Sequence, residues 1–474
     1  MNELPHSTEV AVIGGGPGGY AAAFRAVDLG LQVTLVDLEP NPGGSCLYRG
    51  CIPSKALLHI AKVLTESKQA EQWGIDFGVP NINLDKMRLW KERVIEKMAQ
   101  GLGGLSDRRG VHFIQGRASF LDSNSLKVER DEGELRVSFN HAILATGSRP
   151  TMLPNLSLNS PHVMDSTEAL ELRRVPKNLL VVGGGYIGLE LGTVYSALGS
   201  EVSVVEMTAS LLPGVDLDLV SILSQRLETQ FHGIMLNTKV AELQEVKNGI
   251  QVEFEGENLQ EPEQVFEQVL IAVGRSPNTD AVGLENTKVE TDPHGFVRVD
   301  AQRRTTDSEI YAIGDIAGQP MLAHKATYEG RIVAEVIAGG KATFDPRAIP
   351  AVVFTDPEIA WCGLTGIEAE AENRSVKVCR FPWSASGRAT TLSRPDGLTK
   401  LLIDPETEQV LGVGIVGPGA GELIAEGVLA IEMAAVASDI QWSIHPHPTL
   451  SETVLEATEV FSGHATHIYH PKKD

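Results

Sequence analysis

The chain has 474 residues, of which 42% are hydrophobic and 22% charged, so it is long enough for two to four domains with apolar cores. The formal net charge of -22 argues against nucleic acid as a partner, because binding to a phosphate backbone depends on clustered Lys and Arg. The segment from Met1 to Val10 lacks the basic start and apolar core of a secretory signal, and no segment approaches the roughly 18 apolar residues that span a bilayer. We therefore expect a cytoplasmic protein without a membrane partner.

The first pattern along the chain is typical of a βαβ unit that binds a dinucleotide. An apolar strand precedes the run Gly-Gly-Gly-Pro-Gly-Gly, a helical segment follows it, and a second strand ends at Asp37. In such a unit Gly14 makes the tight turn, Gly16 lets the backbone approach the pyrophosphate, and Gly19 lets helix and strand pack closely. Asp37 is expected to accept a hydrogen bond from a ribose hydroxyl. Taken alone, the pattern would also suit a glycine-rich turn in a generic α/β domain.

The same plan recurs later in the chain, with Gly183, Gly185 and Gly188 between a strand and a helix and Glu206 at the end of the next strand. In both units the acid lies 23 residues after the first glycine, close to the separation of about 20 expected for a ribose-binding acid. An acid at this position suits a free ribose 2′-hydroxyl, so the second unit is predicted to bind NAD rather than NADP. The alternative is that Glu206 is a solvated strand end.

Each unit is followed by an apolar strand that ends in a similar turn. The first of these turns contains Thr146 and Gly147, and the second contains Gly274. The sequence therefore predicts an internal duplication of architecture, with one dinucleotide bound to each copy.

Of the four cysteines, only Cys46 and Cys51 lie close together, and four are too few for a disulfide framework in a chain of this length. Residues five apart on an ideal helix are separated by about 7.5 Å of rise, which exceeds the limit of about 7 Å for disulfide Cα atoms. Cys46 must therefore precede the regular helix or lie on a distorted first turn. Cys51 is then at a helix N-terminus, which favours a thiolate.

Lys55 lies one turn after Cys51 and shares its face of the helix, where it could hold a flavin edge or a carboxylate. A pair of buried structural cysteines and half of a metal site are the alternatives to a redox pair. No companion Cys/His pair lies nearby, so no metal is expected. Cys362 and Cys379 have no evident partner and are expected to be packing residues.

Two GxGxxG units, the block Gly-Gly-Ser-Cys-x4-Cys-Ile-Pro-Ser-Lys and a late His-Pro-Thr-Leu-Ser-Glu occur together in this chain. From about Val10 to Val460 the chain resembles the FAD-dependent pyridine nucleotide–disulfide oxidoreductases, and among them most closely the enzymes that oxidise dihydrolipoyl groups with NAD. The resemblance implies an α/β fold with two Rossmann-like dinucleotide-binding domains, for FAD and NAD, and a C-terminal α+β dimerisation domain. The implied boundaries are 1–150 and 276–349 for the FAD domain, 151–275 for the NAD domain and 350–474 for the dimerisation domain.

The resemblance also assigns roles to individual residues. Cys46 is implied as the thiol that exchanges with the substrate, and Cys51 as the thiol that faces the flavin. His447 matches the catalytic base and Glu452 the carboxylate that orients it, both delivered from the opposite subunit. Glu190 is implied to pair with Lys55. The implied FAD contacts are Gly14, Gly16, Gly19, Asp37, Lys55, Thr146, Gly147, Asp315, Met321, Leu322, Ala323 and His324, and the implied NAD contacts are Gly183, Gly185, Gly188, Glu190, Glu206 and Gly274.

The implied partners are a second copy of the chain and the lipoyl domains of 2-oxo acid dehydrogenase complexes or the H protein of glycine cleavage. The apolar helical run 421–437 suits burial against the second copy, although a plain core helix would look the same. Glutathione-type reductases would carry NADP-binding arginines after the second unit, and mercuric reductase would carry a C-terminal cysteine pair. Neither feature is present. From a different class, the alternative is a non-catalytic flavin-containing assembly subunit.

Three positions depart from the family pattern. Asp37 stands where Glu is usual, Tyr48 and Arg49 stand where Asn-Val is common, and Pro446 replaces an Ala before the catalytic histidine. These departures put the adenosine site, the surroundings of the disulfide and the presentation of His447 in question.

Overall fold

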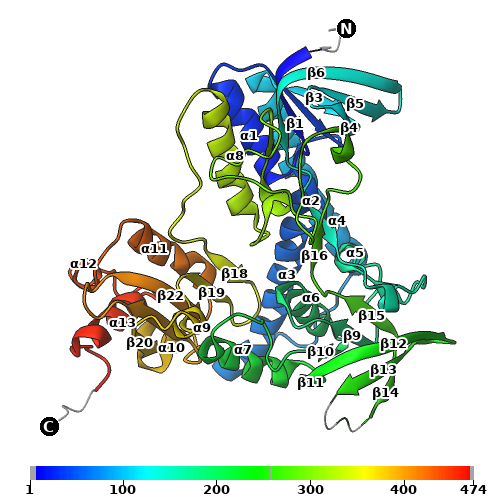
Figure 1. Cartoon of the computed structure of the whole chain (residues 1–474). Helices are drawn as coiled ribbons and strands as arrows, with labels where there is room; N and C mark the ends of the chain where they lie inside the picture. The colour runs from blue at the N-terminus through cyan, green and yellow to red at the C-terminus, as the bar shows by residue number, and fades with distance from the viewer. Residues whose placement is uncertain (1–6, 257–258, 260, 470–474) are drawn as a thin grey trace.

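The computed structural model describes residues 7–256, 259 and 261–469. Its strands form three main sheets, and helices pack against each of them (Figure 1). The first two sheets are built around parallel strands and the third is antiparallel. The predicted fold class, two Rossmann-like units followed by an α+β domain, is confirmed.

The first sheet has a parallel centre in which β1 pairs with β2 on one side and with β6 on the other. Its strand order is β3-β2-β1-β6-β5-β4, with β17 also paired to β6. Helices α1 and α8 lie side by side against its apolar centre (Figure 1). The elements are β1 (Ser7–Ile13), α1 (Pro17–Asp28), β2 (Val33–Asp37), β3 (His112–Gln115), β4 (Arg117–Asp122), β5 (Ser125–Arg130), β6 (Gly133–Leu144), β17 (Ile310–Ala312) and α8 (Ala323–Ile337).

The second sheet repeats the parallel arrangement in the order β11-β10-β9-β15-β8, and a small antiparallel sheet, β12-β13-β14, lies beside it. The chain passes between the first and second units at a two-stranded ribbon of β7 (Ser148–Pro150) and β16 (Arg275–Pro277). The elements are β8 (Val163–Met164), α5 (Ser166–Glu171), β9 (Asn178–Val182), α6 (Tyr186–Ala197), β10 (Glu201–Val205), α7 (Leu217–Gln230), β11 (Gly233–Met235), β12 (Thr238–Val246), β13 (Gly249–Gly256), β14 (Glu263–Phe266) and β15 (Gln268–Ile271).

The third sheet has the order β18-β19-β22-β21-β20, and its helices cover a core of its own. The predicted helix 421–437 was wrong in its extent, because α11 ends at Glu432 and Ala434 takes a left-handed φ of 53° that a helix cannot continue through. The elements are β18 (Ala351–Val353), β19 (Ile359–Gly363), α9 (Gly366–Ala371), β20 (Lys377–Pro382), α10 (Gly387–Thr391), β21 (Leu398–Ile403), β22 (Val410–Val416), α11 (Ala420–Glu432), α12 (Ala437–Gln441) and α13 (Glu452–Ser462).

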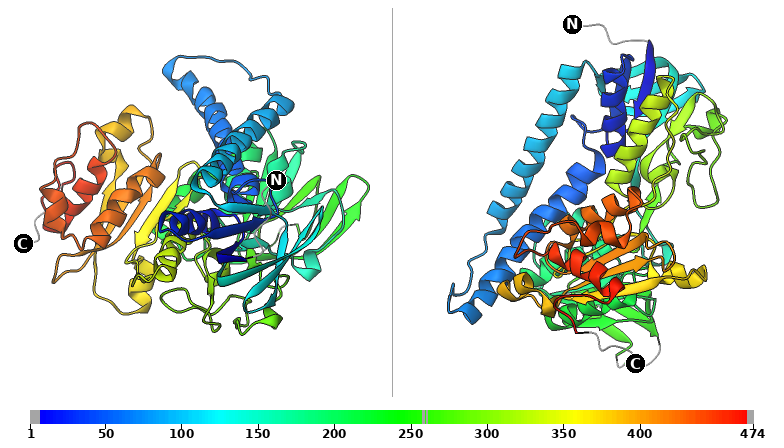
Figure 2. Two further views of the ribbon diagram at one scale, coloured as in Figure 1. Left: turned by 90° about the horizontal axis from the view of Figure 1, so that it is seen from above. Right: turned by 90° about the vertical axis from the view of Figure 1, so that its left-hand side faces the viewer.

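The cysteine segment forms α2 (Gly44–Arg49) and α3 (Cys51–Gln69), and α3 is followed by the long helix α4 (Leu84–Arg109) (Figure 2). The apolar face of α3, with Leu57 and Leu58, lies in the same hydrophobic core as Leu189 and Leu191 of α6. A helix that follows the first nucleotide-binding unit therefore packs into the second. This packing places the cysteines between the two units.

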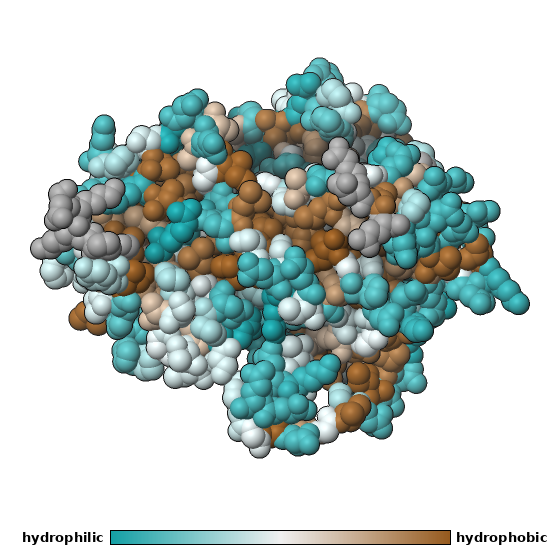
Figure 3. Space-filling view, turned by 90° about the horizontal axis from the view of Figure 1, so that it is seen from below, coloured by the Kyte–Doolittle hydropathy of each residue, from teal (hydrophilic) through white to brown (hydrophobic). Residues whose placement is uncertain are grey.

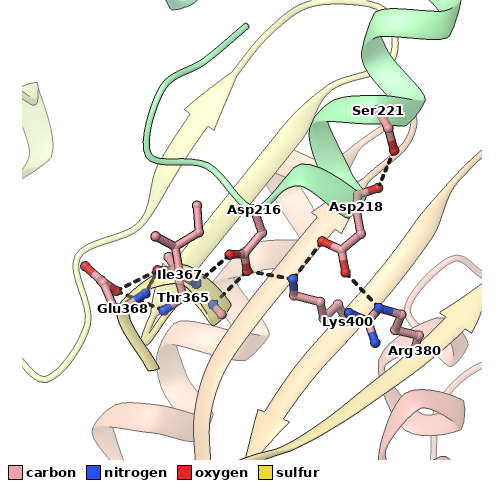
Figure 4. A network of polar contacts seen from close by, with 9 residues as sticks. Asp216, Asp218, Ser221, Thr365, Ile367, Glu368, Arg380 and Lys400 are labelled. Carbon is pink, nitrogen blue, oxygen red and sulfur yellow. Dashed lines mark hydrogen bonds and ion pairs between the residues drawn. The ribbon is translucent and has the colours of Figure 1, made fainter. Parts of the chain in front are cut away.

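A buried ion network joins the second unit to the third sheet (Figure 4). Lys400 on β21 lies 2.6 Å from Asp216 Oδ2 and 2.7 Å from Asp218 Oδ1, at the start of α7. Asp216 also accepts hydrogen bonds from the backbone N–H groups of Gly366 and Ile367, at 2.9 and 3.0 Å, where α9 begins. The network holds the second unit and the C-terminal domain in one relative position.

Replacing Lys400 with Met is expected to destabilise the protein by about 3 to 5 kcal/mol, because Asp216 is left as an unpaired buried charge. Only 3% of the Lys400 side chain is exposed. Denaturant unfolding followed by fluorescence measures the loss. Lys239→Met is the control, since Lys239 and Glu255 form an exposed pair whose loss is expected to change stability by less than about 0.5 kcal/mol. Equal losses in the two variants would contradict a structural role for the network.

On the face shown in Figure 3, hydrophobic and hydrophilic groups are interspersed. Among the residues that the structure describes, no helix is both long and apolar enough to cross a membrane. Large apolar side chains are nevertheless exposed on the C-terminal domain of the single chain, at Leu429, Met433, Trp442 and Ile444.

Candidate active site

One cavity of about 600 Å³ lies where the two nucleotide-binding units and the cysteine helices meet. Its volume falls within the range of about 300–1,000 Å³ typical of ligand sites. Residues that line it come from the first unit, from the cysteine segment and from the second unit. They include Gly14, Gly16, Asp37, Cys46, Cys51, Lys55, Thr146, Gly147, Tyr186, Glu190, Asp315, Met321 and Ala323.

The glycines of the first unit are required by its close contacts. Gly14 has a φ of 104°, and a Cβ there would lie 2.3 Å from the carbonyl oxygen of Ala145. A Cβ on Gly19 would lie 1.8 Å from the oxygen of Gly14, so only glycine lets α1 pack this closely on β1. Gly183 and Gly188 are crowded in the same way in the second unit. Both units thus have the shape of a dinucleotide cradle.

Gly16 and Gly185 occupy the N-cap positions of α1 and α6. A Cβ on Gly185 would meet no atom within 4 Å, and one on Gly16 would meet only the Cα of Gly44, at 4.0 Å. The space in front of each helix N-terminus is therefore open, and the free N–H groups there suit a pyrophosphate. The residues present fit FAD in the first cradle and NAD in the second.

The two strand-end acids have equivalent places. Asp37 accepts from the N–H of Gly15, and Glu206 Oε2 accepts from the N–H of Gly184 at 2.7 Å. Burial raises the pKa of Asp37, while hydrogen bonds from the backbone of Glu39 and Gly15 oppose the rise. Only 7% of Glu206 is exposed, so the interpretation of Glu206 as a solvated strand end is wrong.

Both cysteines of the pair are free thiols in this structure. Cys46 lies on α2, Cys51 is the first residue of α3, and Gly50 separates the helices with φ −144° and ψ −112°. The predicted break in the helix is confirmed. The hydrogen bond with Cys46 lowers the pKa of Cys51 to about 7, assisted by Lys55 and opposed by burial. The same hydrogen bond, together with burial, raises the pKa of Cys46 well above its ordinary value.

The predicted contact between Lys55 and Glu190 is present, with Lys55 Nζ 2.8 Å from Glu190 Oε2. Glu190 is 3% exposed, and its other oxygen accepts from the N–H of Phe354 at 3.0 Å. Lys55 Nζ also lies 4.5 Å from the centre of the Phe354 ring. The pair therefore ties the cysteine helix to α6 and to the start of the C-terminal domain, and both residues line the cavity.

The expected second FAD motif forms a short turn, Gly314–Ala317, that places Asp315 at the cavity. Asp315 accepts a hydrogen bond from the Ser148 hydroxyl, and Arg275 Nε donates to the same hydroxyl at 2.7 Å. Leu322 and His324 do not line the cavity, and His324 Nε2 instead lies 2.7 Å from the carbonyl oxygen of Pro350.

Three cavity-lining residues at the ribbon, Ser148 on β7, Arg275 on β16 and Asn278 directly after β16, were not predicted from the sequence. Thr146 Oγ1 donates to the Asn278 carbonyl at 2.8 Å, and Asn278 Nδ2 donates to the Thr146 carbonyl at 3.0 Å. The sequence does contain a signal for this contact. The two similar turns follow equivalent strands of the duplicated units, and such turns can be expected to lie close together. Gly274 precedes this contact and does not line the cavity.

A buried ion pair on α8 supports the Asp315 turn and was also missed. Glu329 is fully buried, and its Oε2 accepts from the N–H of Gly314 at 2.6 Å. Lys325 Nζ lies 3.1 Å from Glu329 Oε1 and donates to the carbonyl of Gly318 at 3.0 Å. Lys325 and Glu329 are four residues apart, so the sequence places them on one face of a helix. Only the fold shows that this face points at the turn Gly314–Ala317.

His447 and Glu452 form the predicted pair, with His447 Nδ1 2.9 Å from Glu452 Oε1. Glu452 begins α13 and also accepts from the N–H of Thr449 at 2.8 Å. Although partial burial opposes the change, these contacts lower the pKa of Glu452. The His447 side chain is 73% exposed, and neither residue lines the cysteine cavity of its own chain.

The first dinucleotide cradle opens onto the dithiol, and helix α6 of the second cradle lines the same cavity through Tyr186 and Glu190. This arrangement defines a nucleotide-dependent dithiol–disulfide oxidoreductase. Comparison with known proteins gives the same class. Residues 8–330 match the family described as pyridine nucleotide-disulphide oxidoreductase, and residues 349–458 match the dimerisation domain of that family. The chain belongs to the pyridine nucleotide-disulphide oxidoreductases, whose cofactors are FAD and a nicotinamide dinucleotide.

Among its relatives are enzymes named dihydrolipoyl dehydrogenase. Those of Vibrio cholerae and Haemophilus influenzae are each 48% identical to this chain and align with 98% of it, covering 98% and 97% of their own lengths. Among solved structures, LpdA from Mycobacterium tuberculosis superposes with a TM-score of 0.89 at 26% identity, over 96% of this chain and 99% of its own. The HOCl-induced flavoprotein disulfide reductase RclA from Escherichia coli gives a TM-score of 0.84 at 26% identity, with the same coverage.

Proposed function

We propose that this chain is a dihydrolipoyl dehydrogenase, which oxidises dihydrolipoyl groups to lipoyl groups and reduces NAD to NADH through FAD and the Cys46–Cys51 pair. The observation that carries the proposal is the position of Cys51. This thiol, with its pKa lowered to about 7, lies beside the Lys55–Glu190 ion pair at the junction of the two dinucleotide cradles. The names and near full-length identity of the relatives support the choice of dithiol substrate.

Proton transfer is the first step assigned to the chain. With Glu452 holding Nδ1–H, the Nε2 atom of His447 is left as the basic nitrogen. We assign His447 of the partner subunit as the base that takes a proton from the dihydrolipoyl thiol. The orienting hydrogen bond to Glu452 stabilises the imidazolium that results.

Disulfide exchange follows. The substrate thiolate attacks Cys46 of the Cys46–Cys51 disulfide, and Cys51 leaves as a thiolate that its low pKa stabilises. The second substrate thiol then passes its proton to the departing Cys46 sulfur as it closes the lipoyl disulfide, so Cys46 ends as a thiol and His447 keeps the first proton. Bound FAD supplies the route by which the two electrons stored in the cysteine pair reach NAD, giving NADH and one proton.

The cofactor contacts assigned from the sequence, apart from Leu322 and His324, are part of this proposal, as are the domain boundaries at 150, 276 and 350. Glu206 selects NAD, because a buried carboxylate tied to Gly184 suits a ribose hydroxyl and repels a 2′-phosphate. Arg174 precedes the second unit, and the Arg174 guanidinium lies 3.2 Å from His162 Nδ1. NAD is therefore expected to give a much higher kcat/KM than NADP.

The active unit is proposed to be a homodimer that works on lipoyl domains in the cytoplasm. The dimerisation domain and the exposed apolar residues of the C-terminal domain support the dimer. A catalytic base that lies outside the cavity of its own chain supports it independently. Pull-down with a lipoyl domain and cell fractionation test the partner and the location.

Alkylation of the reduced protein by iodoacetamide is expected to rise with pH through a midpoint near 7 at Cys51. The thiolate is the reactive form, and a lowered pKa supplies it at a lower pH than an ordinary thiol does. Cys46→Ala removes the hydrogen bond from the Cys46 thiol, so the midpoint is expected to move upward. A midpoint at the ordinary thiol value of about 8.5 in the unmodified protein would contradict the lowered pKa.

The assay that tests the function compares dihydrolipoamide plus NAD with NADPH plus glutathione disulfide, using the purified FAD-loaded protein. Rapid turnover of the first pair alone supports the proposal. Turnover of the second pair would favour a glutathione-type reductase. A protein that binds FAD but turns over neither pair would favour the assembly-subunit alternative.

A further inference from the structure

Arg49 is the last residue of α2, three positions after Cys46, and it lines the cavity. It reaches the end of the cavity formed by Asp37, Glu39 and the start of β4, where the ribose-binding acid lies. We call this the adenosine end. Arg49 is also one of the positions at which the sequence departs from the family pattern, so the family resemblance assigns it no role.

Arg49 is held in place by the carboxylate of Glu39. Its guanidinium donates to Glu39 Oε1 through two nitrogens, the Nη1 contact measuring 2.6 Å. Glu39 in turn donates its backbone N–H to Asp37 Oδ1 at 2.8 Å. The neighbouring Tyr48 hydroxyl donates to the Asn41 carbonyl at 3.1 Å. Together these bonds attach the end of α2 to the loop after β2, across the adenosine end.

The charges of this end call for a cation. Asp37 and Glu39 are both acidic, and a bound FAD would add the two negative charges of its pyrophosphate to the same cradle. Burial raises the pKa of Asp37, and Arg49 is the cation that opposes the rise. Arg117 is the other cation that lines this end. A planar guanidinium fixed by Glu39 presents donors and a flat face to the nucleotide without a large further loss of side-chain freedom.

We propose that Arg49 is an additional FAD-binding residue, which closes the adenosine end of the cavity while Glu39 holds its guanidinium. It compensates for the shorter acid Asp37 by adding a cationic contact to the same half of the cofactor. This inference rests on the assignment of FAD to the first cradle. Arg49 also attaches α2, the helix that carries Cys46, to the cofactor site.

The test measures FAD binding to apoprotein by flavin fluorescence. Arg49→Val introduces the residue common in the family and is expected to weaken FAD binding on the order of 10-fold, mainly through faster release. Arg49→Lys keeps the charge and loses the planar guanidinium. It is expected to bind FAD more weakly than the unmodified protein and more tightly than Arg49→Val. ADP contains only the adenosine half of FAD. Its affinity, measured by competition with FAD, should also fall from the unmodified protein through Arg49→Lys to Arg49→Val.

Arg25→Val is the matched control. Arg25 lies on α1 in the same unit, pairs with Glu335 and is 43% exposed, against 42% for Arg49, but it does not line the cavity. It is expected to leave FAD affinity unchanged. Unchanged affinity in Arg49→Val, or an equal loss in Arg25→Val, would overturn the role of Arg49. A loss of FAD with no loss of ADP would also overturn it. Failure of the unmodified protein to bind FAD would instead remove the cofactor assignment itself.

Discussion

Replacing Cys51 with Ser is expected to abolish NADH formation from dihydrolipoamide, with a loss in kcat of at least about 1,000-fold, while the protein keeps its FAD. The reason is that no disulfide can then form to accept the two electrons of the substrate. Cys46→Ser should be equally inactive, because Cys46 is the sulfur that the substrate attacks. Steady-state absorbance of NADH measures both, and the flavin spectrum reports cofactor retention.

Cys379→Ala is the control for these two variants. Cys379 is a buried free thiol in the C-terminal core, and burial raises its pKa to about 11, so it has no reactive thiolate near neutral pH. Its loss is expected to lower stability modestly and to leave the reaction intact. Substantial turnover in either Cys46→Ser or Cys51→Ser would show that electrons reach NAD without the cysteine pair.

Replacing His447 with Gln is expected to lower kcat/KM for dihydrolipoamide by about 100- to 10,000-fold, the range typical of a lost general base. The matched control is His467→Gln. His467 is another exposed histidine of the same domain whose Nδ1 contacts a glutamate, Glu456, at 2.5 Å. This control should retain the activity of the unmodified protein.

The position of His447 outside its own cavity gives a sharper version of this experiment. Mixed dimers of a His447→Gln subunit and a Cys51→Ser subunit contain one complete site if the base acts across the interface. Mixing the two inactive proteins under conditions that exchange subunits should therefore restore activity. If activity does not return although mixed dimers form, the base acts within its own chain or does not act at all.

The two glycine cradles, the break between Cys46 and Cys51 and the contact of Lys55 with Glu190 could all be predicted from the sequence. The first two follow from local geometry, because a Cβ at Gly19 would clash with the oxygen of Gly14, and an unbroken helix would hold Cys46 and Cys51 too far apart for a disulfide. The third came from the family resemblance, since nothing local in the sequence connects positions 135 residues apart.

Other features depend on the tertiary arrangement and could not be predicted. The helix expected over 421–437 has a suitable apolar pattern throughout, but it ends at Glu432 because the backbone at Ala434 turns into the left-handed region. Arg275 contacts Ser148, which lies 127 residues away in the sequence, and Glu329 contacts the turn at Gly314 only because α8 folds back beside it. The packing of α3 into the core of the second unit is likewise a contact between segments with no common local pattern.

The most direct test of the central claim is a single turnover without oxygen, using FAD-loaded protein and one equivalent of NAD per subunit. The protein is first treated with dihydrolipoamide, freed of excess substrate, and its new thiols are counted before and after NAD is added. We predict that the substrate creates two thiols per subunit, at Cys46 and Cys51, and that NAD removes them while one NADH per subunit appears. Formation of NADH with no change in these thiols would contradict the claim that the cysteine pair carries the electrons.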